Sequence, residues 1–512
     1  MHSPTFLDQR GAWMERAEAL KPQLTRHTLA PQSVVRVEHI DFVWQGCVAV
    51  PEYPAADLPQ QWWTRGTSFL LDFGESVVGH IRLKVHAIDP VIDSPLHLRF
   101  FAAETPYELT ADLSAFHGRL SRSWLQEEEI HLDYAPVEVT LPRRFALRYL
   151  KVEVVAVPRS IRFDELCVEC ESAVPFELPP PPPGLDLELQ AIDRASVRTL
   201  RNCMQSVFED GPKRDRRLWH GDLRLQAFTN AVTYRNFPLV ERCLWLLAGC
   251  TKDDGFFPSA VILQPSPVGS SRVLDYAMLL GRTLLEHTRF SGSTTLAKAL
   301  YPLAAYQFDF FREGLGADGT FQNLRHFWVF LDHCRELDRQ IPILACASFS
   351  LNGLAELAQL LGHRKDAKRF RDEAEAWRLL ARNRLDPQLH LLRSGADGQL
   401  SVASQVWGII AGVLTPEEGK AALEALDAHP EAVQPVTPYM THFYLEACRI
   451  CGDEARLMRH LRRYFGGMIA RGADTFWEAY NEKDPYFSPY GDPLCNSCCH
   501  AWSSTPAWFL RK

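Results

Sequence analysis

The chain has 512 residues, of which 46% are hydrophobic and 23% are charged. This is an ordinary globular composition with enough apolar residues for a large core, so it excludes a disordered or fibrous chain as the main state. The formal net charge of −8 argues against a general polyanion-binding protein, because phosphate backbones select for basic surfaces. Aromatic residues make up 11%, which is compatible with sugar-stacking platforms as well as with filled cores.

The N-terminal residues and the cysteines predict a cytoplasmic protein. The first residues lack the basic region and following apolar stretch of a secretory signal. Apolar runs such as residues 243–250 are far shorter than the roughly 18 residues that cross a bilayer. The 13 cysteines are an odd number scattered over a long chain, which indicates reduced thiols rather than a disulfide framework. We therefore expect a soluble cytoplasmic protein.

The first third of the sequence predicts antiparallel strands. Apolar residues occupy every second position in residues 80–87, 96–100 and 150–154. Strict alternation gives each strand one buried and one solvated face, as in a β-sandwich. We therefore expect an N-terminal antiparallel β-sandwich domain over residues 1–178.

Five consecutive prolines and a glycine form residues 179–184, the strongest boundary in the chain. A proline run cannot continue a helix or a central strand, so this segment is predicted to be a linker. After it the apolar spacing becomes helical, and Gly362 is placed to end one helix before another begins. No fixed-length repeat indicates a solenoid. Residues 185–512 are therefore predicted to form helical hairpins closed into a toroid.

The densest cluster of charged residues is segment 210–222, with the sequence Asp-Gly-Pro-Lys-Arg-Asp-Arg-Arg-Leu-Trp-His-Gly-Asp. It can be explained as a solvated loop between helices or as a basic localisation patch. However, carboxylates interrupt the basic run, and Gly, Pro and Trp indicate a fixed loop, which often carries function on a rigid scaffold. The residues alone leave a structural and a functional interpretation equally open.

A second segment places Trp477 next to Glu478. The ordinary explanation, which the dipeptide alone favours, is a packed aromatic beside a surface acid. The alternative is sugar chemistry, in which an apolar ring faces the sugar and a carboxylate moves a proton.

A third segment, residues 495–500, contains three cysteines and His500, which invites a zinc interpretation. A zinc site needs four well-placed ligands, however. The pair Cys167 and Cys170 lies in a predicted strand, where positions three apart face opposite sides. Buried thiols beside a hydrogen-bonded histidine are therefore preferred, and no metal or other cofactor is expected. The sequence contains no dinucleotide-binding, phosphate-loop, zinc-protease or nucleophile-elbow motif.

In this order, and after a β domain, the three segments resemble the bacterial α-L-rhamnosidases of glycoside hydrolase family 78, in the six-hairpin superfamily. The family's catalytic loop has the pattern Asp-x-Pro-x-Arg-Asp-Glu-Arg-x-Gly-Trp-x-Gly-Asp. It is matched by Asp210, Pro212, Arg214, Asp215, Arg217, Trp219, Gly221 and Asp222. Trp477 and Glu478 look like the family's Trp-Glu pair that supplies the base, and residues 499–503 look like its closing motif, whose His faces the sugar.

One position departs from the family pattern. The Glu of the Asp-Glu-Arg triplet, the general acid in many members, is Arg216 here, and the Gly before the Trp is missing. An arginine cannot donate this proton, because its pKa stays above about 12. Another carboxylate of the loop must then be the acid. Asp222 is our first assignment and Asp215 our second.

The resemblance implies an inverting hydrolase that releases terminal α-L-rhamnose, with an (α/α)6 barrel after the sandwich. Asp222 would protonate the leaving oxygen and Glu478 would activate a water, the two carboxyl groups being about 6.5–9.5 Å apart. Asp275 and Asp332 are lesser candidates, expected to be structural. The residues expected to bind the substrate are Asp210, Arg214, Asp215, Trp219, Trp477 and His500.

Two other functions stay open. The first is a six-hairpin hydrolase or lyase that acts on another sugar such as a uronide, whose carboxylate would pair with an arginine of the loop. The second is a non-catalytic rhamnose-binding protein that has lost its acid at Arg216. The expected partner is a small rhamnoside, with no nucleic acid and no membrane, and the sequence does not decide whether the chain forms a homodimer.

Overall fold

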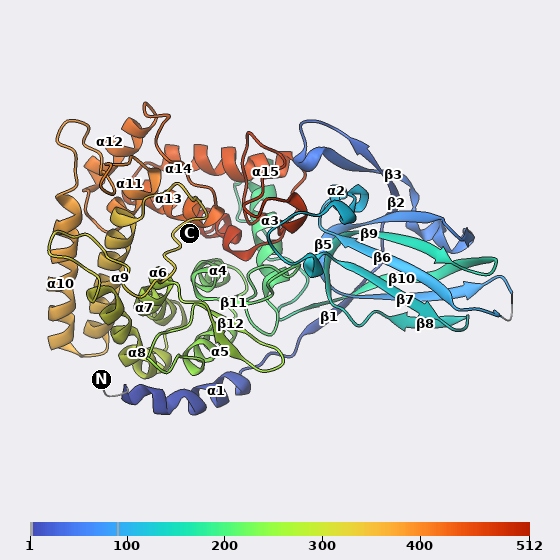
Figure 1. Ribbon diagram of the computed structural model, residues 1–512, viewed down its shortest axis with the longest axis horizontal. Helices are drawn as coiled ribbons and strands as arrows, with labels where there is room; N and C mark the ends of the chain where they lie inside the picture. Colours follow the sequence, from blue (N-terminus) through green and yellow to red (C-terminus); the bar gives the residue numbers. More distant parts are fainter. Residues whose placement is uncertain (1–3, 90–91) are drawn as a thin grey trace. The chain divides into compact units, whose positions relative to one another are not determined.

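The computed structural model describes residues 4–89 and 92–512 (Figure 1). The chain divides into two compact units. One unit is mostly helical and contains the chain up to Lys21, residues 217–463 and Lys512. The other contains residues 22–216 and 464–511 and holds most of the strands.

The helical unit contains the helices α1 (Arg10–Ala19), α4 (His220–Val232), α5 (Phe237–Gly249), α6 (Leu274–Met278), α7 (Leu280–Ser291), α8 (Thr295–Arg312), α9 (Gln340–Leu360), α10 (Arg364–Arg382), α11 (Val402–Ile410), α12 (Pro416–Leu426), α13 (Pro438–Ile450) and α14 (Glu454–Leu461). It also contains the short antiparallel strands β11 (Leu218–Trp219), β12 (Ala260–Ile262) and β13 (Val268–Ser270).

The second unit, called the sheet unit below, contains the strands β1 (Thr25–Leu29), β2 (Ser33–His39), β3 (Cys47–Pro54), β4 (Trp63–Thr64), β5 (Ser68–Ala87), β6 (Leu96–Ala103), β7 (Glu127–Leu132), β8 (Val137–Thr140), β9 (Phe145–Ala156) and β10 (Ser160–Ser172). Its helices are α2 (Pro106–Thr110), α3 (Leu187–Cys203), α15 (Gly467–Ala470) and α16 (Pro506–Leu510).

The long strand β5 connects the strands of the sheet unit. Its first half pairs with β2 and β9, and its second half pairs with β8 and β10, all antiparallel. Alternate residues of these strands point into one core, where Leu71, Leu83, Val152 and Phe163 are fully buried. The three runs of alternating residues lie within β5, β6 and β9, which confirms the predicted antiparallel sandwich.

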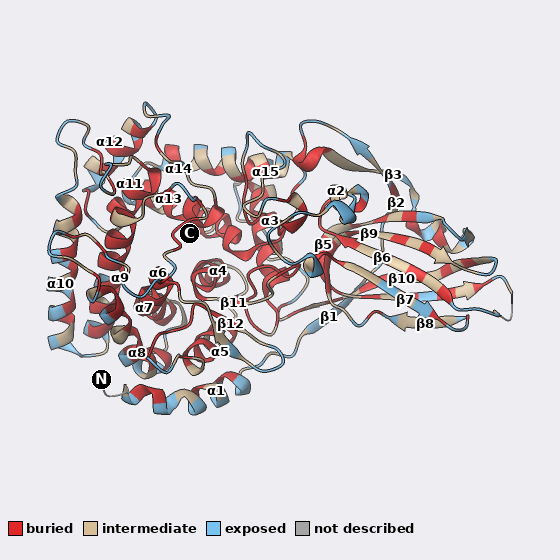
Figure 2. Ribbon diagram, in the orientation of Figure 1, coloured by how far each residue is buried: buried red, intermediate tan, exposed pale blue. Residues whose placement is uncertain are grey.

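Helices α9 and α10 run side by side as a hairpin (Figure 1). Gly362, between them, has a φ of 86°, the left-handed conformation that glycine adopts freely, so it ends α9 as predicted. Figure 2 shows α9 buried almost throughout, whereas α10 is buried on one face and exposed on the other.

Helix α9 has the length and the mean hydropathy (1.4) of a membrane span, although the apolar runs of the sequence predict none. However, 89% of the apolar stretch of α9 is buried inside the structure, as is usual for a core helix. Packing against α7, α10 and α11 explains the apolar composition, because a helix covered on all sides needs no polar face.

The two compact units have other bounds than the predicted domains, whose boundary at residues 179–184 stays a prediction. The first helix after the prolines, α3, packs against β5 and β10, and its Asn202 donates a hydrogen bond to the carbonyl oxygen of Ser76. The N-terminal helix α1 packs instead against α5. Strands and helices separate along the sequence as expected, but packing places α3 in the sheet unit and α1 in the helical unit.

Candidate active site

The loop before β11 is fixed in an unusual backbone conformation. Asp215 and Arg216 have positive φ values of 61° and 49°, which cost non-glycine residues about 1–3 kcal/mol each. The N–H of Arg216 donates to the carbonyl oxygen of Gly211 at 3.3 Å, and the N–H of Ala501 donates to that of Asp210 at 2.8 Å. Such strain persists only where the surroundings enforce it, and it is concentrated at functional sites.

The side chain of Arg216 holds this loop together. Its guanidinium donates to the carbonyl oxygens of Pro212 at 2.9 Å, Lys213 at 3.4 Å and Arg144 at 2.8 Å. Burial and the neighbouring Arg144 cation lower the pKa of Arg216 to about 10, below the value expected from the sequence. Arg216 is still charged at neutral pH and cannot serve as the acid. Arg216 is therefore a brace between the loop and the start of β9.

Two side chains hold the carboxylate of Glu478. Arg214 donates from Nη2 to Oε2, and Tyr490 donates from its hydroxyl to Oε1 at 2.5 Å. The guanidinium of Arg214 lies over the Tyr490 ring, 4.5 Å from its centroid. Arg214 and Glu478 are each only 3% exposed, so water is largely excluded from this ion pair. The carboxylate is thus fixed at both of its oxygens.

Arg214 stays charged despite its burial. Desolvation disfavours the cation, but the nearby oxygens of Tyr490, Asp215 and Asp210 outweigh it and raise the pKa of Arg214. A permanent cation beside Glu478 favours the ionised form of that carboxylate, which is the form that a general base needs.

His500 lies beside the same loop. A Cβ atom on Gly211 would come 2.6 Å from Oγ of Ser497 and 3.3 Å from Nδ1 of His500, so only glycine permits this close approach. The His500 ring packs on Trp502 with 4.3 Å between ring centroids. The sheet unit therefore brings together the loop, the Glu478 segment and the His500 segment.

The indole of Trp477 is buried and stacks on Trp44, with ring centroids 4.3 Å apart. The two rings line a cavity of about 180 Å³, together with Glu104 and Arg148 among other residues. The predicted contact between Trp477 and a sugar stays a prediction.

A buried charged cluster adjoins the loop and was missed in the sequence. Lys213 is 1% exposed, and its Nζ donates to Glu108 at 2.8 Å and lies 3.9 Å from Glu104. Burial raises the pKa of Glu104 to about 8, although Lys213 opposes this, so Glu104 is mostly protonated at neutral pH. Because Lys213 and Glu108 are 105 residues apart, no local pattern could have linked them.

Asp222 lies in the helical unit, in the first turn of α4, and is 2% exposed. The preceding Gly221 packs directly on Tyr276, since a Cβ atom there would come 2.1 Å from the tyrosine ring. Trp219, the N-cap residue of α4, contacts Trp328 edge to face at 6.2 Å between ring centroids.

The two units therefore divide the predicted site residues. Asp222 and Trp219 belong to the helical unit. The sheet unit holds Asp210, Arg214, Asp215, Trp477, Glu478 and His500. Tyr490, which contacts Glu478, was not predicted, because the segment that carries it has no pattern beyond turn-forming and aromatic residues.

The lesser candidates Asp275 and Asp332 bind backbone groups of the helical unit. Asp275 accepts hydrogen bonds from the N–H groups of Phe330 at 2.9 Å and Leu331 at 3.2 Å. Asp332 accepts from both the N–H and the hydroxyl of Thr437, the N-cap residue of α13. Burial raises the pKa of each carboxyl to about 6 even though these hydrogen bonds lower it.

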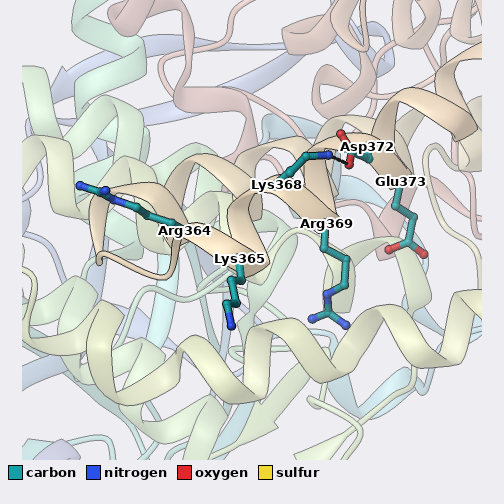
Figure 3. Close-up of a pocket in the computed structure, with 6 residues that line it drawn as sticks. All are labelled: Arg364, Lys365, Lys368, Arg369, Asp372 and Glu373. Atoms are coloured by element: carbon teal, nitrogen blue, oxygen red, sulfur yellow. Dashed lines mark hydrogen bonds and ion pairs between the residues drawn. The ribbon is translucent and has the colours of Figure 1, made fainter.

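A shallow pocket of about 680 Å³ on α10 contains none of the predicted site residues (Figure 3). Its two acids are paired with cations, Asp372 with Lys368 at 2.5 Å and Glu373 with Arg312 at 2.7 Å. It therefore lacks a carboxyl group suited to acid catalysis. The residues that line it are Arg364, Lys365, Lys368, Arg369, Asp372 and Glu373.

Within residues 4–89 and 92–512, no group of three or more His, Cys, Asp or Glu side chains is arranged to hold a metal ion. All 13 cysteines are free thiols. Burial raises the pKa of Cys498 well above its ordinary value, which makes this thiol unreactive.

Comparison with known proteins identifies both parts of the chain. Residues 31–172 match the glycosyl hydrolase family 78 alpha-rhamnosidase N-terminal domain. Residues 186–512 match the bacterial alpha-L-rhamnosidase 6 hairpin glycosidase domain. No curated protein matches the chain.

Solved rhamnosidases have the same fold. The rhamnosidase from Klebsiella oxytoca with rhamnose bound is 37% identical, over 98% of each chain, with a TM-score of 0.94. The family 78 rhamnosidase of Bacillus sp. GL1 is 22% identical over 86% of this chain and 46% of its own, with a TM-score of 0.74. The Streptomyces avermitilis α-L-rhamnosidase complexed with L-rhamnose is 18% identical over 96% of this chain and 44% of its own, with a TM-score of 0.67.

The two domain matches follow each other in the order that the sequence motifs predict. The identity to the Klebsiella enzyme extends over nearly the whole chain, so the relationship includes both the strands and the helices. The chain therefore belongs to glycoside hydrolase family 78, the α-L-rhamnosidases with a six-hairpin glycosidase domain.

Proposed function

We propose that this chain releases terminal α-L-rhamnose from small rhamnosides by hydrolysis with inversion of configuration. Family membership supports the rhamnoside as substrate. The observation that carries the chemistry is the buried Glu478 carboxylate, oriented through both of its oxygens by Arg214 and Tyr490. The free thiols support a cytoplasmic location.

In this proposal Glu478 takes a proton from the attacking water while Asp222 protonates the departing oxygen. Inversion needs these two carboxyl groups on opposite sides of the anomeric carbon, about 6.5–9.5 Å apart, and forms no covalent intermediate. Asp210, Asp215 and His500 bind the sugar, and Trp219 contacts the substrate at the start of α4.

Most cations of the loop are already engaged, which favours a neutral sugar over a uronide as the substrate. A substrate carboxylate would need a cation that is free to pair with it. Arg214 is paired with Glu478, Lys213 with Glu108, and Arg216 is bound to backbone carbonyls. Three of the four basic residues of the loop are thus already engaged.

The base is tested with Glu478→Gln. Hydrolysis of an aryl α-L-rhamnoside should fall by about 10²–10⁴-fold while rhamnose still binds, because only proton transfer is lost. Glu482→Gln, the same change at an exposed position, is the matched control.

Inversion is tested on the wild-type protein, where proton NMR of the first product of hydrolysis should show β-rhamnose. Initial α-rhamnose would refute inversion, and cleavage of unsaturated uronides alone would favour the other sugar class.

The acid is tested with Asp222→Asn and Asp215→Asn. A poor leaving group needs a full proton, whereas a nitrophenolate leaves without one, so loss of the acid should impair alkyl rhamnosides far more than nitrophenyl rhamnoside. We expect this selective loss in Asp222→Asn. A residue that binds only the sugar, such as Asp210, should affect both substrates alike when changed to Asn. Selective loss in Asp215→Asn instead would move the acid to Asp215.

A further inference from the structure

The helical unit contains an exposed tryptophan whose backbone is held by hydrogen bonds. Trp328, in the segment between α8 and α9, is 46% exposed, and the nearby Leu324 is 62% exposed. Single exposed apolar residues are common and need no explanation by themselves. The way in which this tryptophan is held is the unusual feature.

The backbone of Trp328 is fixed on both sides. Its N–H donates to the carbonyl oxygen of Arg272, and its own carbonyl accepts from the N–H of Leu274, each at 2.9 Å. Two residues later, the buried Asp275 carboxylate binds the N–H of Phe330 at 2.9 Å. Phe330 in turn is 2% exposed and packs edge to face on Trp328 at 5.4 Å. An aromatic surface held this firmly loses little entropy when it binds a ligand.

This tryptophan contacts the N-cap residue of the helix that carries the proposed proton donor. Trp328 and Trp219 meet at an interplanar angle of 89°, so their rings form two walls of a corner. Trp219 is the N-cap residue of α4, whose first turn contains Asp222. Because the acid gives its proton to the oxygen that departs with the aglycone, aromatic walls next to the acid lie on the aglycone side of the bond that breaks.

Two cationic side chains of the segments around this corner are already paired with carboxylates. Arg272 donates to Asp254 at 2.6 Å, and Arg325 donates to Glu313 through two hydrogen bonds of 2.7 Å. A second sugar would require several hydrogen-bonding groups, whereas a flat aromatic ring needs mainly stacking surface. The exposed indole of Trp328 supplies such a surface.

We infer that Trp328, with Trp219, forms an aglycone site that accepts a flat aromatic aglycone of the rhamnoside. This inference rests on the proposed function and on Asp222 as the acid. It assigns Trp328 a role in substrate specificity. The rhamnosyl half of the substrate is bound by Asp210, Asp215 and His500, as proposed above.

The test compares three substrates: phenyl α-L-rhamnoside, methyl α-L-rhamnoside and a rhamnosyl-glucose disaccharide. Trp328→Ala should lower kcat/KM for the phenyl substrate about tenfold, the effect of a lost aromatic stack, and should change the methyl substrate less than about twofold. Trp328→Phe should keep much of the phenyl activity. Trp62→Ala removes a similarly exposed tryptophan (42%) of the sheet unit and serves as the matched control.

Equal losses on the phenyl and methyl substrates would overturn the inference, because the residue would then act on the common rhamnosyl half or on folding. A loss confined to the disaccharide would also overturn it, because the aglycone site would then take a sugar. Failure of the wild-type protein to release rhamnose from all three substrates would refute the proposed function, and the inference with it. Release by the wild type without a selective loss would refute the inference alone.

Discussion

Glu478 has chemically different partners at its two oxygens. Arg214 contributes a full positive charge at Oε2, whereas Tyr490 contributes a neutral hydroxyl donor at Oε1. Hydrogen bonds to the charged form of a carboxylate favour that form. Because the Arg214 guanidinium also rests on the Tyr490 ring, the tyrosine positions both members of the ion pair. Tyr490 is therefore a positioning residue.

Removal of this hydroxyl should change the pH dependence of activity. In Tyr490→Phe the carboxylate loses a donor and takes up a proton more readily, so the acidic limb of the kcat/KM profile should shift to higher pH. We also expect kcat to fall about tenfold, since the proposed base, Glu478, is less well oriented. Tyr480→Phe is the control, because the Tyr480 hydroxyl accepts a hydrogen bond from Arg471. An unchanged acidic limb in Tyr490→Phe would show that Arg214 alone sets the state of the base.

At the scale of single elements, the start of α4 depends on a close contact between backbone and ring. Gly221 leaves no space for a Cβ atom above Tyr276. The neighbouring His220 donates from its ring Nδ1–H to the carbonyl oxygen of the same tyrosine at 2.8 Å. Burial lowers the pKa of His220 to about 4, so the neutral imidazole makes this bond. These two contacts position the start of α4 and therefore Asp222.

Gly221→Ala should therefore reduce both stability and activity. The added methyl group would force α4 away from Tyr276, and overpacking of this kind costs about 1–3 kcal/mol. We expect a lower melting temperature and a lower kcat/KM. Gly11→Ala is the matched control, since a Cβ atom at Gly11, within α1, would meet nothing within 4 Å. A fully active Gly221→Ala variant would show that α4 can shift without displacing the proposed acid, Asp222.

At the scale of the whole molecule, the protonation of Glu104 links stability to pH. Its pKa rises from 4.5 to about 8, mainly through burial, so the folded protein binds a proton that the unfolded chain releases. The stability from this proton is complete below pH 4.5 and is lost as the pH rises towards about 8. Glu104→Gln, which stays neutral, should therefore gain stability relative to the wild type as the pH increases.

Melting temperatures measured between pH 5 and about pH 8 test this linkage. The difference between Glu104→Gln and the wild type should grow across that range and level off above it. Glu52→Gln, at an exposed position of β3, should show a constant difference. A constant difference for Glu104→Gln as well would mean that the Glu104 carboxyl is already ionised in the folded protein.

Much of the fold and part of the site were predictable because they depend on local patterns. Alternation located the strands, the proline run separated strands from helices along the chain, and the charged loop pointed to Asp210 through Asp222. The partners of these residues were not predictable. Tyr490 reaches Glu478, and Glu104 reaches Lys213, only through the folded chain. The grouping of α3 with the strands likewise arises from packing, which no sequence period records.

Arg216 also constrains how this loop can evolve. Its guanidinium satisfies the carbonyl oxygens of Pro212, Lys213 and Arg144, all of which are acceptors. A glutamate at this position, as in many family members, would face the same oxygens with another acceptor and leave them without a donor. A single mutation therefore cannot restore that acid, because the backbone of the loop would have to change as well. A glutamate at position 216 is thus incompatible with the present path of the main chain in this loop.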